Sequence, residues 1–184
     1  MDQKTGAEII ARVLKGERQA YALLVEEYKG PIFNLAYRMT GSREDADDLT
    51  QETFIRAYQN LHQFDQSKKF FTWLYTIGIN LIRNNLKKNA RDVSHLAAAD
   101  SALEYQSQGN GRGEGDVLFD DRMIRLERII QKLPVDLREA IILKFHQDLT
   151  FEEVANVTGD SVSAVKMRIY RGLEKMKQMM EDTN

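Results

Sequence analysis

The sequence predicts an all-α protein of two small helical domains joined by a flexible acidic linker. Apolar residues recur with the 3.6-residue period of an amphipathic helix along most of the chain. Only two of the 184 residues are proline, and strand-like alternation is scarce. Residues 92–121 carry one arginine against seven acidic residues, with glycines alternating over 109–115, a composition typical of a linker. We therefore predict domains at 1–91 and 117–184, with the linker at 92–116.

The overall composition argues against disulfide-bonded, thiolate-metal and membrane-spanning proteins. Hydrophobic residues make up 42% and charged residues 29% of the chain, as in globular proteins. The absence of cysteine excludes disulfides and thiolate metal sites and fits a reducing cytoplasm. No apolar run approaches the roughly 20 residues of a membrane span, and the N-terminus lacks a signal-peptide core. We expect a cytoplasmic protein without membrane insertion.

The first domain begins with short helical segments. Apolar residues at 9–14 and 20–25 predict two short helices. Pro31 is placed to start the next helix in its first turn, and Gly41 to end it. Ser42 is predicted to cap a helix from about residue 43 to 61.

That helix has two distinct faces. The predicted core face contains Ala46, Leu49, Phe54, Ala57, Tyr58 and Leu61. On the opposite face, helical spacing brings together Asp48, Gln51, Glu52 and Ile55. An exposed isoleucine among polar residues indicates a protein docking surface, although single exposed apolar residues are also ordinary. A carboxylate metal site is a weaker interpretation, because no Glu-x-x-His pair is present.

Residues 67–91 hold six basic residues, no acidic residue and the only tryptophan. One predicted helix face contains Phe70, Trp73, Leu74, Ile77, Leu81 and Asn84. The other contains Thr72, Thr76, Asn80, Arg83 and Lys87. The second face can neutralise phosphate, and the aromatic residues can stack on unpaired bases. An amphipathic helix with a solvated basic face is the alternative.

The second domain has the pattern of a helix-turn-helix. Its predicted helices span 117–133, 134–146, 151–158 and 162–180, with Leu137, Ile141, Ile142 and Phe145 facing inward. Thr150 and Glu153 form a capping box, Gly159 ends that helix, and Ser161 caps the last one. The predicted outward face carries Ser163, Ala164, Lys166, Met167, Tyr170 and Arg171. These side chains suit the major groove of DNA, although basic helical hairpins also occur in proteins that bind no DNA.

The sequence gives no reason to propose catalysis or a cofactor. The three histidines lie far apart in the chain. No Ser-His-Asp, Cys-His, HExxH or paired-carboxylate pattern occurs at a recognisable spacing.

Three stretches, in order and across nearly the whole chain, resemble the bacterial extracytoplasmic-function (ECF, group 4) sigma factors. They are GPIFNLAYRMTGSREDADDLTQETFIRAYQNLHQF, FFTWLYTIGINLIRNNLKK and LPVDLREAIILKFHQDLTFEEVANVTGDSVSAVKMRIYRGLEKMK. The resemblance implies a subunit that directs core RNA polymerase to promoters. Its implied partners are the beta-prime coiled coil and beta flap of the polymerase, promoter DNA and an anti-sigma factor, which can hold such a protein at the inner membrane face.

The resemblance also implies roles for residues. Asp48, Gln51, Glu52 and Ile55 match the surface that binds the beta-prime coiled coil. The minus-10 element would be opened and read by Lys69, Phe71, Trp73, Tyr75, Thr76, Asn80, Arg83, Asn84 and Lys87, with the loop 64–71 capturing an unstacked base. The minus-35 duplex would be read by Ser161, Ser163, Lys166, Met167, Tyr170 and Arg171. Met167 departs from the small polar residue of many relatives.

Two other functions fit parts of the sequence. An autonomous helix-turn-helix regulator would explain residues 150–178 but not the docking face or the basic aromatic helix. A mimic that sequesters the regulator of a sigma factor could dispense with the DNA-facing residues that are present here. The weak overall basicity, with a net charge of -2, fits a subunit that must not be titrated by non-specific DNA. We expect the acidic linker and N-terminal segment to suppress such binding.

Overall fold

The computed structural model describes the backbone of residues 3–99 and 121–181 and the side chains of residues 3–91 and 125–181. Within these ranges the chain is helical and has no strand, which confirms the predicted all-α class. The elements are α1 (Gln3–Leu14), η1 (Arg18–Ala20), α2 (Tyr21–Thr40), α3 (Arg43–Gln59), η2 (Leu61–Gln63), α4 (Phe70–Ala99), α5 (Asp121–Lys132), α6 (Val135–Ile141), η3 (Ile142–His146), α7 (Phe151–Thr158) and α8 (Val162–Glu181).

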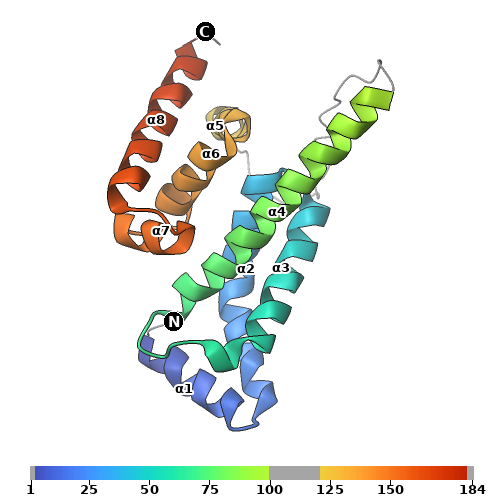
Figure 1. The fold of residues 1–184 in the computed structure, drawn as a ribbon. Coiled ribbons are helices and arrows are strands. Elements are labelled where there is room, and N and C mark those ends of the chain that lie inside the picture. The colour runs from blue at the N-terminus through green and yellow to red at the C-terminus, as the bar shows by residue number, and fades with distance from the viewer. Residues whose placement is uncertain (1–2, 100–120, 182–184) are drawn as a thin grey trace.

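The first unit is a bundle of α1 to α4 (Figure 1). Leu24 and Leu35 of α2, Ala46 of α3 and Leu74 and Ile79 of α4 have no exposed surface and form its centre. The predicted end of α2 at Gly41 is confirmed, because this residue adopts a left-handed conformation with φ 75°. Ser42 caps α3 as predicted, with its Oγ accepting a hydrogen bond from the Asp45 N–H at 3.2 Å.

Helix α2 corrects one prediction. Pro31 lies inside a continuous 20-residue helix and does not start a new one. Proline lacks the N–H for one intrahelical bond, but Leu24 before it and Ile32 after it are both buried in the same core. We attribute the continuity of the helix to this shared burial.

Helix α4 is longer than predicted and its buried face differs. It continues to Ala99, eight residues into the segment predicted as linker; residues 100–116 of that segment lie outside the described residues. Tyr75, Ile79 and Ile82 join Leu74 in the core, whereas Asn84, predicted on the packing face, is exposed. The buried arc is broader than a single stripe because α2, α3 and α7 all pack on α4.

The second unit comprises α5 to α8. The predicted caps are confirmed: Thr150 and Glu153 form a capping box, Gly159 is left-handed with φ 77°, and Ser161 Oγ accepts from the Ala164 N–H at 3.2 Å. Phe145 was predicted to face inward, but it is 55% exposed. It lies in the π-helical turn η3, whose i→i+5 hydrogen bonds enclose one more residue than those of an α-helix and so rotate the side chains away from the α-helical register.

The two units pack against each other. Helix α7 contacts α4, and α5 contacts α2; Figure 1 shows α5 to α8, in orange and red, beside the bundle. Gln131 and Arg138 donate hydrogen bonds, each 2.6 Å long, to the carbonyls of Arg38 and Met39. These are among the last carbonyls of α2, which have no partner within the helix. The buried side chains of both units form one continuous cluster.

Candidate nucleic-acid interface

The basic helix α4 presents a polar surface next to an aromatic cluster. Asn80, Asn84 and Lys87 are exposed. Thr76 is partly exposed, and its hydroxyl donates to the Thr72 carbonyl at 2.9 Å. At the start of the helix, the ring of Trp73 lies 5.2 Å from that of Phe64 and 5.7 Å from that of Phe70. This packing fixes the tryptophan at the edge of the helix.

A cavity of about 240 Å³ lies between α1 and the loop that precedes α4. Its lining comprises Gln3, Gly6, Ala7, Ile10, Tyr28, Phe64, Gln66, Lys68, Lys69, Phe70 and Phe71. Aromatic rings and two lysines around a concavity provide stacking and phosphate-binding groups together. The predicted base-capturing loop 64–71 forms one wall. The contribution of α1 was not predicted, because no sequence pattern indicates that α1 folds back onto this loop.

Hydrogen bonds within the loop fix its shape. The Ser67 N–H and hydroxyl both donate to Oδ1 of Asp65, at 3.0 Å and 2.7 Å. These bonds lower the pKa of Asp65, because they favour its ionised form. Gln3 of α1 donates to the Ser67 carbonyl at 3.3 Å. The cavity wall is therefore organised before any ligand binds.

Helix α3 carries the predicted docking face. Asp48 and Gln51 are exposed, and Ile55 is 50% exposed. Glu52 is partly exposed and accepts a hydrogen bond from Arg56 Nε at 2.6 Å. The four residues thus share one accessible face, as the helical spacing predicted.

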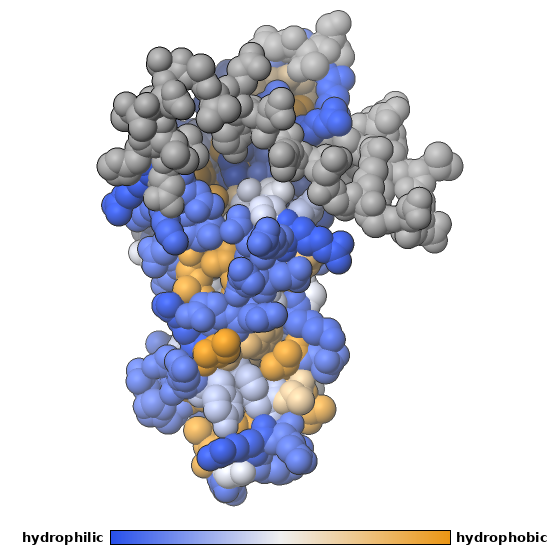
Figure 2. Space-filling model, turned by 90° about the vertical axis from the view of Figure 1, so that its right-hand side faces the viewer, coloured by the Kyte–Doolittle hydropathy of each residue, from blue (hydrophilic) through white to orange (hydrophobic). Residues whose placement is uncertain are grey.

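Ile55 also lines an apolar groove between the start of α2 and the end of α3. The groove has a volume of about 550 Å³ and is lined by Arg18, Gln19, Tyr21, Ala22, Val25, Glu26, Phe54, Ile55, Tyr58 and Gln59. Tyr58 was predicted to face the core, but it is exposed here, at 39%. Its ring meets that of Tyr21 edge to face at 5.0 Å, and the Tyr21 hydroxyl donates to the Phe54 carbonyl at 2.8 Å. Figure 2, which shows the right-hand side of the view in Figure 1, has apolar patches amid a hydrophilic surface on its lower half.

Helix α8 presents the predicted outward face of the helix-turn-helix. Ser161, Ser163, Lys166 and Arg171 are exposed; Met167 and Tyr170 are 53% and 66% exposed. Val165 and Ile169 are buried on the opposite face. The Lys166 ammonium lies over the Phe151 ring, 5.4 Å from its centroid. A row of donors with one aromatic and one thioether side chain therefore faces outward along α8.

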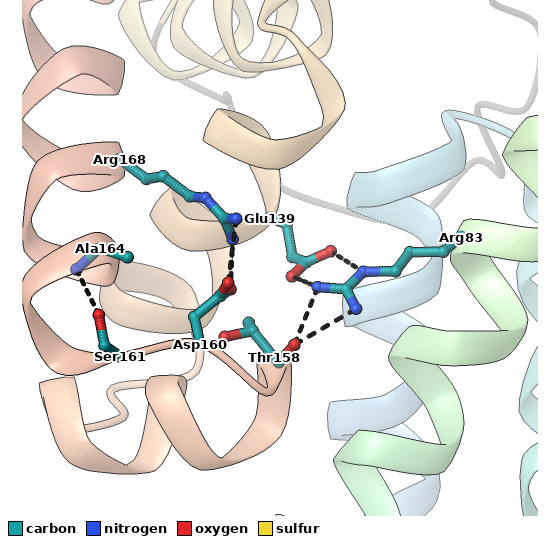
Figure 3. A network of polar contacts seen from close by, with 7 residues as sticks. All are labelled: Arg83, Glu139, Thr158, Asp160, Ser161, Ala164 and Arg168. Atoms are coloured by element: carbon teal, nitrogen blue, oxygen red, sulfur yellow. Dashed lines mark hydrogen bonds and ion pairs between the residues drawn. The ribbon is translucent and has the colours of Figure 1, made fainter.

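Three of the residues predicted to contact minus-10 DNA bond to the second unit instead of lying free. Arg83 donates to both carboxylate oxygens of Glu139, at 2.8 Å and 2.6 Å (Figure 3). The Tyr75 hydroxyl donates to Gln147 at 2.7 Å. Lys69 pairs with Glu153 at 2.7 Å. No sequence signal indicated these contacts, since each joins residues at least 56 positions apart.

Burial of Glu139 has an electrostatic consequence. Only 1% of this residue is exposed, and the burial raises the pKa of its carboxyl, while the hydrogen bonds from Arg83 oppose the rise. The same hydrogen bonds raise the pKa of Arg83. Asp160 of the same unit is paired in turn with Arg168. Figure 3 shows these four side chains as one cluster between α4 and α8.

Comparison with known proteins shows the family to which the chain belongs. Residues 24–92 match the model of sigma-70 region 2, and residues 123–176 match that of sigma-70 region 4. The ECF RNA polymerase sigma factor SigW of Bacillus subtilis is 37% identical over 181 residues, which cover 94% of this chain and 95% of SigW. The chain belongs to the ECF group of the sigma-70 family. It is therefore a sigma factor, a subunit that directs promoter-specific transcription.

Solved structures agree with this assignment. The structure of CnrH in complex with the cytosolic domain of CnrY superposes on this sigma factor with a TM-score of 0.70 and 26% identity, over 97% of this chain and 98% of CnrH. The sigma factor RpoE, solved with the anti-sigma factor NepR from Bartonella quintana, has the same fold, with a TM-score of 0.68 and 19% identity over 88% and 96% of the two chains. These findings give no support to the alternative of an autonomous regulator. Among the described residues, no helix has the length and apolarity needed to span a membrane.

Proposed function

We propose that this sigma factor divides promoter recognition between its two units. Residues 1–91 dock on core polymerase and open the minus-10 element, and residues 117–184 read the minus-35 element as duplex. The observation that carries the proposal is the outward face of α8, where Ser163, Lys166 and Arg171 are all exposed. An exposed basic helix that follows a capped helix and turn has the geometry of a major-groove reader.

The docking site for the polymerase is the apolar groove extended by the polar face of α3. Ile55 and Tyr58 supply apolar contact, and Asp48, Gln51 and Glu52 supply a rim that accepts hydrogen bonds. A helix of the beta-prime coiled coil fits such a groove, because an apolar centre with a polar rim is the usual anatomy of a protein interface.

Binding energy drives the opening of the minus-10 element, and the sequence shows no recognisable catalytic pattern that would supply energy from nucleotide hydrolysis. Extruding a stacked base costs a few kcal/mol. The cavity beside Phe71 and the surface formed by Asn80, Asn84 and Lys87 interact with an unpaired strand, and their binding shifts the equilibrium towards the open duplex. Trp73, held at the edge of α4, supports the upstream end of the opened strand.

We further propose that the protein acts in the bacterial cytoplasm and is held inactive by an anti-sigma factor. CnrH was solved with the cytosolic domain of CnrY and RpoE with the anti-sigma factor NepR. A single partner that covers both units would prevent promoter recognition, because the two DNA-reading surfaces must act together.

In vitro reconstitution tests the proposed function. The purified chain is mixed with bacterial core RNA polymerase, and transcription of a genomic promoter library is mapped at the start sites. We expect discrete starts that share minus-10 and minus-35 sequences and are absent with core polymerase alone. A chain that binds core polymerase yet gives no starts would contradict the proposal.

A further inference from the structure

Acidic and amide side chains of the second unit occupy three of the nine residues expected to contact minus-10 DNA: Arg83 and Tyr75 on α4, and Lys69 directly before it. Glu139 lies on α6, Gln147 directly after η3 and Glu153 on α7, and each bonds to a different predicted minus-10 residue. The Thr158 carbonyl adds longer contacts to Arg83, at 3.4 Å and 3.5 Å. The contact therefore covers the surface from Lys69 to Arg83, not a single point.

The chemistry of this contact imitates a nucleic-acid backbone. A guanidinium binds carboxylate and phosphate with the same two-pronged geometry, and Arg83 makes this bidentate contact with Glu139. The Lys69 ammonium is held by a single carboxylate oxygen of Glu153. A phosphate group and these carboxylates cannot occupy the same donors simultaneously.

The arrangement is also incompatible with reading both promoter elements at once. The two elements lie about 25 base pairs apart, or about 85 Å along B-DNA at 3.4 Å per step. In this structure α8 packs on α7 and α7 packs on α4, so α8 and α4 are separated by two helix-packing distances, about 20 Å. The units must separate before α4 and α8 can engage one promoter.

We propose that the free sigma factor closes on itself, with Glu139 and Glu153 of the second unit acting as strand mimics that block the minus-10 surface of α4. This inference rests on the proposed function of α4. Core polymerase, by engaging both units, opens the chain and exposes Arg83, Lys69 and Tyr75. This closure would suppress DNA binding by the free protein, an effect that the sequence analysis expected from the acidic linker.

Energy transfer between two dyes measures the closure directly. The chain has no cysteine, so Lys4→Cys and Lys175→Cys, both at exposed positions, accept labels without competing sites. We expect one high-transfer population for the free protein. The Glu139→Gln/Glu153→Gln variant should move most molecules to low transfer, because both carboxylates lose their charge while their shape is kept.

A matched variant separates closure from net charge. Glu152→Gln/Glu174→Gln removes the same two charges from exposed positions of the second unit and should leave the transfer unchanged. With a fluorescent single-stranded 12-mer of degenerate sequence, the interface variant should bind about tenfold more tightly than wild type, and the matched variant at most about threefold. An equal gain for both variants, or unchanged transfer in the interface variant, would overturn the proposal.

Circular dichroism of the variants and an assay of transcription initiation help to interpret the result. Because Glu139 is buried, circular dichroism is used to check that the double variant is folded. If it is unfolded, the same transfer and binding measurements are made on Glu153→Gln alone. The glutamine amide oxygen of that variant can still accept the capping bond from the Thr150 N–H. The transfer experiment needs neither polymerase nor promoter. A chain that initiates transcription but is open when free would refute the closure alone, whereas a closed chain that cannot initiate would refute the proposed function.

Discussion

Replacement of Ile55 by aspartate tests the proposed docking groove most sharply. Half of the Ile55 residue is exposed, and full burial of an isoleucine side chain stabilises by about 1.5–3 kcal/mol. Covering the remaining half on docking is thus worth about 1 kcal/mol, which is the expected loss for Ile55→Ala. Aspartate adds the cost of desolvating a carboxylate in an apolar groove. We expect a total of about 3–4 kcal/mol, or roughly 200- to 1000-fold in Kd.

The assay is competition with a labelled wild-type chain for core polymerase, followed by fluorescence anisotropy at fixed salt. Leu14→Asp is the matched control, because Leu14 is 44% exposed but does not line the groove. It should change the Kd less than about threefold. Equal affinities for the Ile55→Asp and Leu14→Asp variants, with circular dichroism showing both folded, would refute the assignment of the groove.

Further substitutions probe the DNA-reading helices and the second unit. Arg171→Ala should weaken minus-35 recognition by about 1–3 kcal/mol, measured as the open-complex yield on promoters with and without that element. Asn80→Ala should slow promoter opening, followed by permanganate reactivity, more than it weakens closed-complex binding. Gly172→Ala should destabilise the second unit by about 1–3 kcal/mol in chemical denaturation, because an added Cβ lies 2.9 Å from Cγ1 of Ile141. Burial and a nearby arginine lower the pKa of His146 in the folded protein. As the pH falls below about 6.5, the unfolded chain therefore binds a proton at this residue before the folded chain does, and the free energy of unfolding should decrease. His146→Gln should reduce this pH dependence.

Each of these predictions has a contrary result. Loss of yield by Arg171→Ala on promoters that lack the minus-35 element would mean a general defect. An Asn80→Ala variant that opens promoters at the wild-type rate would remove the residue from strand capture. A stable Gly172→Ala variant would show that α6 and α8 can separate, and an unchanged pH slope in His146→Gln would assign the titration to another group.

Local chemistry made much of the fold predictable. The caps at Ser42, Thr150 and Ser161 and the left-handed glycines at 41 and 159 depend on residues within a few positions of each other, and all were located from the sequence. The exposed faces of α3 and α8 also followed from helical spacing. These features depend on periodicity and short-range hydrogen bonds, which a single sequence displays directly.

The errors arose where tertiary contacts decide. Pro31 reads as a helix start, yet burial on both sides of it keeps α2 continuous. Tyr58 fits an inward stripe, but the start of α2 turns its ring into the groove beside Tyr21. Phe145 leaves its expected face because of a π-helical turn. The closure of Glu139 on Arg83 joins two units through a contact that no local pattern encodes.

Site-directed DNA cleavage tests the central claim, that one chain reads two promoter elements with two different helices. Because the chain has no cysteine, an iron chelate can be attached at Ser163→Cys on α8 or Asn84→Cys on α4, both exposed positions. In the polymerase complex on a mapped promoter, the α8 conjugate should cut duplex at the minus-35 element, and the α4 conjugate should cut the non-template strand at the minus-10 element. Cleavage of both elements by either conjugate, or exchanged positions, would contradict the account.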